Sequence, residues 1–131
     1  MGDTYGEVRI KLEKVDGRGE IYSIDLGDGE EVMLLRSVAG SVRGGHSHNV
    51  DEVVVLLSGA MEYRRIVAEG IGEEREMEAG EISWNPAGVP HMARFLEESW
   101  VMEKKLCRKG EWKDEEYGPW RELVRESMEA S

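Results

Sequence analysis

The chain is short of several things that particular classes of protein need. It has one cysteine, Cys107, so no internal disulfide can form, and a cytoplasmic location is expected. No apolar run is long enough to span a bilayer, and the first residues lack the pattern of a signal peptide. Basic residues number 17 against 28 acidic ones, which gives a net charge of −11. A chain this acidic is not expected to bind nucleic acid or an anionic membrane.

The composition that remains is typical of one globular protein. The 131 residues are expected to form a single domain over residues 1–131. The apolar fraction of 40% and the four tryptophans are enough for a real core. Glycine is frequent, with 16 residues, and proline is rare, with three. Many glycines between short apolar runs indicate tight turns and favour an all-β chain.

Short apolar or alternating segments recur along the chain and predict strands. Val8, Ile10 and Leu12 alternate with charged residues, as in a strand with one wet face. Further strands are expected over residues 21–26, 32–38, 53–57, 61–68, 82–84, 91–96 and 100–106. Turn-forming residues separate them, for example at 16–19, 27–29 and 69–72. The regular spacing predicts a barrel or sandwich over about residues 5–108.

The C-terminal segment has a different period. Gly118 and Pro119 form a helix entry, because proline is tolerated at the first helical position. The apolar residues then recur at helical spacing: Trp120, Leu123, Val124 and Met128. We therefore expect an amphipathic helix over residues 119–129, packed on the outside of the barrel or on a second subunit.

All three histidines fall in two short segments, residues 40–59 and 80–91. His46 and His48 are two residues apart, so in a strand they point to the same face, and Glu52 has the same parity. His91 belongs to a second strand-turn-strand unit. Two antiparallel hairpins packed face to face would bring these four side chains to one point.

Glycine and proline residues surround the histidines in a way that suits such a site. Gly44 and Gly45 let the backbone bend just before His46. Pro86 and Gly88 predict a tight turn that delivers His91.

Three imidazoles and one carboxylate form the ligand set of a transition metal. This set suits Fe(II), Mn(II), Ni(II), Zn(II) or Cu(II), and ligand type alone does not choose among them. Four protein ligands leave one or two coordination positions open for substrate, water or dioxygen. The sequence therefore predicts one divalent transition metal, with Fe, Mn, Zn and Ni as the main candidates.

The two histidine segments resemble the two conserved motifs of the cupin superfamily. Matches to the first motif are Gly40, His46, His48, Glu52 and Gly59, and matches to the second are Gly80, Pro86, Gly88 and His91. Phe95 stands where the second motif usually ends in asparagine. The resemblance covers about residues 32–104 and implies a double-stranded β-helix, or jelly roll, with the metal inside. It also implies that His46, His48, Glu52 and His91 are the ligands.

A narrower resemblance points to a different chemistry. Asp16-Gly17-Arg18-Gly19 and Arg43-Gly44-Gly45-His46-Ser47-His48 look like segments of nucleotide-sugar 3,4-ketoisomerases and, more remotely, of dTDP-4-dehydrorhamnose 3,5-epimerase. This resemblance implies that His46 and His48 act as acid and base on a dTDP-ketosugar without metal, and that Arg43 holds the diphosphate. Two residues depart from that pattern: Glu52 replaces the usual glutamine, and His91 has no counterpart.

The expected function is a metal-binding cupin that acts on, or binds, a small polar organic molecule. An enzyme of the oxygenase or isomerase type is favoured over a non-catalytic binding or sensing module. Candidate substrate-pocket residues are Arg43, Tyr63, Arg65, Trp84 and Met102. A homodimer is also expected, because pairing hides exposed sheet edges, through the N-terminal strand and the C-terminal helix.

Overall fold

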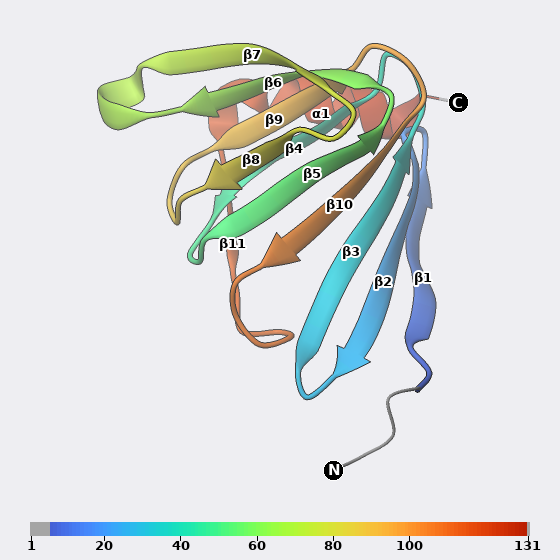
Figure 1. The fold of residues 1–131 in the computed structure, drawn as a ribbon. Helices are drawn as coiled ribbons and strands as arrows, with labels where there is room; N and C mark the ends of the chain where they lie inside the picture. The colour runs from blue at the N-terminus through green and yellow to red at the C-terminus, as the bar shows by residue number, and fades with distance from the viewer. Residues whose placement is uncertain (1–5, 131) are drawn as a thin grey trace.

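The computed structural model describes residues 6–130, apart from the side chain of Glu69, and shows two antiparallel sheets packed face to face (Figure 1). In spatial order, one sheet contains β1 (Arg9–Asp16), β2 (Gly19–Gly27), β3 (Glu30–Ser37), β10 (Ser99–Lys105), β5 (Glu52–Ser58) and β8 (Ile82–Asn85). The other contains β11 (Asp114–Glu116), β4 (Val42–His48), β9 (His91–Phe95), β6 (Ala60–Ile66) and β7 (Gly72–Glu78). The predicted fold class, an all-β jelly roll with a C-terminal helix, is confirmed.

The space between the sheets holds the main apolar core. Alternate residues of the strands point into it, as the period of two demands. The buried members are Leu35, Val54, Leu56, Met61, Tyr63, Met77, Ala93, Phe95 and Val101. Leu56 and Met61 are 0% exposed, so this part of the barrel interior is fully closed.

Most strands lie where the sequence predicts them, with ends shifted by a few residues. Three strands have no counterpart among the predicted ranges: β4, where only His46 and His48 were interpreted as lying in a strand, and β7 and β11, which were not predicted at all. β7 reads Gly-Glu-Glu-Arg-Glu-Met-Glu, and only Met77 of it is buried. β11 consists of three exposed acidic residues. Neither has an apolar alternation of its own, and each forms because a neighbouring strand offers backbone hydrogen bonds.

The C-terminal helix packs on the outer face of the second sheet. Gly118–Trp120 forms a 3₁₀ turn, closed by a hydrogen bond from Trp120 N to Tyr117 O, and α1 follows at Arg121–Glu129. A second apolar cluster joins helix and sheet through Val42, Met92, Trp120, Leu123 and Val124. The predicted start of the α-helix at Pro119 is therefore two residues early, because the chain tightens into the 3₁₀ turn first.

The outer edge of the larger sheet is apolar. β1 ends the sheet, and Val8, Ile10, Leu12 and Val15 are about half or more exposed. Dimerisation through this strand stays a prediction, and the predicted barrel start at residue 5 lies outside the described residues.

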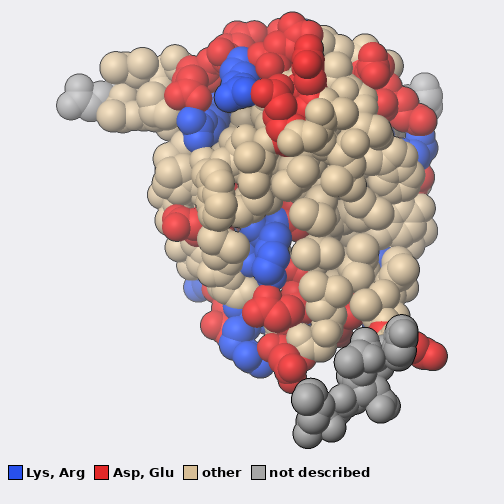
Figure 2. Space-filling model, in the orientation of Figure 1, with Lys and Arg blue, Asp and Glu red and all other residues tan. Residues whose placement is uncertain are grey.

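On the face shown in Figure 2, acidic side chains gather at the top with basic ones interspersed. No helix within residues 6–130 is both long and apolar enough to cross a membrane.

Candidate metal centre

A bulge in β4 sets the position of His46. Gly44 pairs with Met92 on β9, but the next paired residue is His46, which lies opposite His91. Gly44 and Gly45 have φ values of +91° and +81°, which side chains rarely adopt. A Cβ on Gly44 would lie 2.7 Å from the His91 carbonyl oxygen, so that position has no room for one. The expected bend before His46 is thus a β-bulge.

A backbone hydrogen bond joins the two histidine segments. The turn after β8 carries Gly88, whose N–H donates to the carbonyl oxygen of His48 at 2.8 Å. Gly88 has a φ of +82°, which glycine adopts without strain. The turn therefore fixes the start of β9, and with it His91, against the end of β4.

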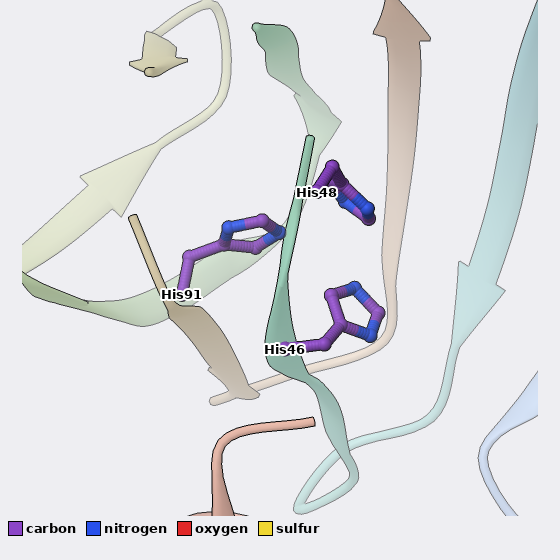
Figure 3. A group of neighbouring side chains, drawn as sticks. All are labelled: His46, His48 and His91. Carbon is purple, nitrogen blue, oxygen red and sulfur yellow. The ribbon is translucent and has the colours of Figure 1, made fainter. Parts of the chain in front are cut away.

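The three imidazoles lie around one common space (Figure 3). Each offers a ring nitrogen, and these nitrogens all lie within 4.8 Å of one another. Ring centroids are 4.6 Å apart for His46 and His48, 5.0 Å for His48 and His91, and 5.2 Å for His46 and His91. His48 and His91 are buried, while His46 is partly exposed.

Glu52 adjoins two of the three rings from the start of β5. Its Oε2 lies 3.3 Å from His48 Nε2, and its Oε1 lies 3.2 Å from His91 Nε2. The carboxylate is 1% exposed. Burial works to raise its pKa, but the contacts with His48 and His91 outweigh burial and hold the pKa far below its ordinary value. Glu52 is therefore a buried anion.

Asp114 is a functional residue that the sequence analysis missed. β11 pairs with β4 so that Asp114 lies opposite His48, and Asp114 Oδ1 is 2.6 Å from His48 Nδ1. Nδ1 then carries the proton toward Asp114, and Nε2 is directed at Glu52. Burial works to lower the pKa of His48, but the contacts with Asp114 and Glu52 raise it to about 9.

The other histidine of β4 has the opposite electrostatic setting. Burial, together with the neighbouring His91 and His48, lowers the pKa of His46 to about 4. At neutral pH His46 is therefore an uncharged imidazole with a lone pair to offer. The two members of the His-x-His pair differ because only His48 faces a carboxylate on each side.

Two charged residues at the end of β10 also escaped the sequence analysis. Lys105 Nζ lies 3.3 Å from Glu52 Oε2. Burial works to lower the pKa of Lys105, but the charges of Glu103 and Glu52 outweigh it and raise the pKa. Burial, followed by the charge of Glu52, raises the pKa of Glu103 above its ordinary value.

Tyr63 and Asn85 support the site from the core side. Asn85 Nδ2 donates to Tyr63 Oη at 2.6 Å and to Glu52 Oε1 at 3.4 Å. The Tyr63 ring stacks on the His91 ring, with the two ring centroids 6.2 Å apart. Burial raises the pKa of Tyr63 well above its ordinary value, so it stays a neutral hydroxyl. Asn85 thus contacts Glu52 from the core side, and Tyr63 packs against His91.

The candidate pocket residues are spread over different parts of the barrel. Arg43 lines a cavity of about 560 Å³ together with His46. Arg65 and Trp84 lie instead at a separate surface hollow, where Arg65 Nη1 donates to the Trp84 carbonyl oxygen and Arg65 pairs with Glu73. Trp84 is 58% exposed.

Met102 does not face the barrel interior. It pairs with Leu34 and Val55, on the opposite face of β10 from the buried Val101. The sequence analysis placed Met102 in the pocket because strand parity was not known. Of the five candidate pocket residues, Arg43 alone shares a cavity with His46 in the described part of the chain.

Solved structures of other proteins show which fold this is. A variant of oxalate decarboxylase from Bacillus subtilis matches with a TM-score of 0.67 and 18% identity, over 84% of this chain and 30% of that one. CapF, a capsular polysaccharide assembling protein of Staphylococcus aureus, matches with a TM-score of 0.63 and 17% identity, over 79% of this chain and 30% of that one. Vicilin from hazelnut, Corylus avellana, matches with a TM-score of 0.63 and 16% identity, over 84% of this chain and 34% of that one.

All three proteins have one architecture in common. The fold is that of the cupins. The chain spans about a third of the length of each of these proteins, and at such identities the likeness concerns the fold. No family model and no curated protein matches the sequence.

Two buried atoms show that this site fits a metal. His48 Nε2 and Glu52 Oε2 are fully buried, and neither completes a hydrogen bond of good geometry, although they lie 3.3 Å apart and the ammonium of Lys105 lies 3.3 Å from the same carboxylate oxygen. Buried polar atoms without a partner are rare and costly. A cation held among the histidine nitrogens and this carboxylate would supply the missing partner to both. Nitrogen and carboxylate donors are those of a divalent transition metal.

Proposed function

We propose that this protein is a metal-binding cupin that acts on a small polar organic molecule. In this proposal His46, His48, His91 and Glu52 hold one divalent ion of Fe, Mn, Zn or Ni. The observation that carries it is the cluster of three imidazoles inside the barrel, with nitrogens within 4.8 Å of one another, beside two buried atoms that make no hydrogen bond, His48 Nε2 and Glu52 Oε2. The Mn(II) centres of the structurally similar B. subtilis oxalate decarboxylase support a metal in this fold.

The surrounding residues each have a defined task in the proposed function. A bound metal would supply Lewis acidity toward an oxygen of the substrate. Asp114 holds His48 with its Nε2 toward the site, and Lys105 offsets part of the negative charge on Glu52. His46 borders the large cavity, so a substrate reaches the centre from the His46 side.

A metal-loading experiment tests the proposal. Purified protein, stripped with a chelator and then dialysed against Mn²⁺, Fe²⁺, Zn²⁺ or Ni²⁺, is expected to retain one metal ion per chain by elemental analysis. An enzyme should show turnover that stops on chelation and returns with metal, whereas a binding module should show metal-dependent ligand affinity without product. Failure to retain any of the four ions would refute the metal centre.

One contact favours a second function, proton transfer without metal. The pairing of His48 Nδ1 with Asp114 resembles the way a carboxylate orients a catalytic imidazole. His46 and His48 would then act as base and acid on a dTDP-ketosugar. Isomerisation of such a sugar that survives chelation, and is lost in His48→Ala, would place this function above the metal-dependent one.

A further inference from the structure

The cavity beside the metal centre has one polar wall and one apolar wall. It measures about 560 Å³, within the range of about 300–1,000 Å³ typical of small-molecule sites. Ile21 and Leu35 line it from the first sheet, and Val124 and Met128 line it from α1. The C-terminal helix therefore borders the cavity with apolar side chains as well as with Arg121 and Arg125, and a ligand with an apolar body would bury surface there.

Arg43 is the one buried guanidinium on the polar wall without a counter-ion. Its side chain belongs to a residue only 5% exposed. Nε donates to Ser37 Oγ at 2.6 Å and Nη2 donates to the Arg36 carbonyl oxygen at 2.9 Å. Nη1 is buried and has no hydrogen-bond partner. Among the described side chains, none forms an ion pair with Arg43, and a buried charge without a partner is strongly unfavourable.

The other arginines of this cavity already have anionic partners. Arg18 pairs with Asp16, Arg121 pairs with Glu116, and Arg125 pairs with Glu122 and Glu129. Glu103 also lines the cavity but forms no ion pair with Arg43, and burial raises its pKa above the ordinary value. Lys14 shares Asp16 with Arg18. Within the described residues, Arg43 is therefore the guanidinium of this wall that has no ion-pair partner, and its Nη1 makes no hydrogen bond.

We infer that the ligand is an organic monocarboxylate with an apolar body, whose carboxylate pairs with Arg43 and whose body packs between Leu35 and α1. Guanidinium and carboxylate form strong charge-assisted hydrogen bonds. One charge and one free nitrogen match a carboxylate better than a phosphate dianion. Because His46 and Arg43 line the same cavity, a ligand so placed lies beside the metal centre. This inference rests on the proposed function, since it names the class of molecule that the metal site handles.

Four probes separate the parts of this inference. Binding of benzoate to the Zn²⁺-loaded full chain is compared, by calorimetry, with that of benzamide, acetate and phenyl phosphate. Benzamide keeps the shape without the charge, acetate keeps the charge without the body, and phenyl phosphate carries a second charge. Benzoate is expected to bind at least about 10-fold more tightly than each of the other three, because it alone satisfies both walls.

Matched arginine variants then assign the charge preference. Arg43→Gln is expected to weaken benzoate at least about 10-fold and to leave benzamide unchanged. Arg125→Gln removes an equal charge from the same cavity, but Arg125 has its own carboxylate partners, so benzoate affinity is expected to stay within about twofold. Zinc content and circular dichroism are measured on every variant.

Each result either supports the inference or overturns it. Equal binding of benzoate and benzamide, tighter binding of phenyl phosphate, or unchanged benzoate affinity in Arg43→Gln would each overturn it. If Arg43→Gln does not fold, the four probes on the natural chain still decide. The zinc content distinguishes failure of the proposed function from failure of the inference about the ligand. A chain that takes up no zinc contradicts the proposed function. A zinc-loaded chain that binds benzoate and benzamide equally contradicts only the inference.

Discussion

The two ends of the barrel interior are built by the same strands but have opposite character. β5 begins with the buried anion Glu52 and ends near Leu56, which is 0% exposed in the apolar core. β9 begins with His91 and ends with Phe95 in the same core. In both strands, inward positions change from polar to apolar within five residues. The barrel thus separates a structural half from a functional half along each strand, not between strands.

The two ends of the barrel interior differ in what they contribute to the stability of the fold. Apolar burial at the Leu56 end contributes directly to stability. At the Glu52 end, buried charges and two unpartnered atoms cost free energy in the metal-free chain. A site that opposes folding locally is expected where binding depends on it. The comparison predicts that changes at one end leave the other largely intact.

The largest expected effect is on metal binding when the polar end loses an imidazole. His48→Ala should lower the affinity for Zn²⁺ by more than about 100-fold, because loss of a ligand exceeds the roughly 10–100-fold effect of a supporting contact. Competition with a chelating dye measures this affinity. Ser47→Ala, between the two histidines on β4, is the control and should bind zinc normally. Normal zinc affinity in His48→Ala would remove His48 from the ligand set.

At the apolar end the expected effect is on stability. Leu56→Ala should lower the free energy of unfolding by about 2–5 kcal/mol, because it leaves a cavity in a closed core. Urea denaturation of the metal-free protein measures the change. The folded variant should still bind one zinc ion per chain. Loss of zinc binding in folded Leu56→Ala would mean that the two ends are not separable.

A smaller effect is expected from the carboxylate behind His48. Asp114→Asn keeps the size of the side chain but removes the charge that orients Nδ1, so zinc affinity should fall about 10–100-fold. Glu115→Gln on the same strand is the matched control, since Glu115 is exposed and pairs with Ser47. Equal affinities in the two variants would show that Asp114 does not support the site.

The pH dependence of the unfolding free energy of the metal-free protein should come from the polar end of the barrel. The folded pKa of His48 is raised from 6.5 to about 9, so its stabilising contribution is complete below pH 6.5 and is lost as pH rises through about 9. Unfolding free energy in chelator should therefore fall across this range, and zinc affinity should rise as fewer protons compete. His48→Ala should flatten the fall, and Leu56→Ala should keep it. An unchanged slope in His48→Ala would assign the titration elsewhere.

Particular residues show how far the sequence could predict this site. The spacing of His46 and His48, and the turn before His91, are local features, so the cluster of three rings could be predicted. Asp114 could not, because β11 is three acidic residues with no pattern and exists only through pairing with β4. Lys105 and Met102 lie on opposite faces of the same strand, β10. Only the pairing register of β10 decides which of these faces points into the barrel.

By itself the sequence determined the kind of site, because imidazole and carboxylate chemistry and the two-residue strand period depend on neighbours along the chain. Only the tertiary structure decided which charges meet there. Hydrogen bonds between strands far apart in sequence place Asp114 against His48 and Lys105 against Glu52. They also leave Arg43 without an ion-pair partner in a cavity bordered by α1. Such pairings depend on register and packing, which no short stretch of residues encodes.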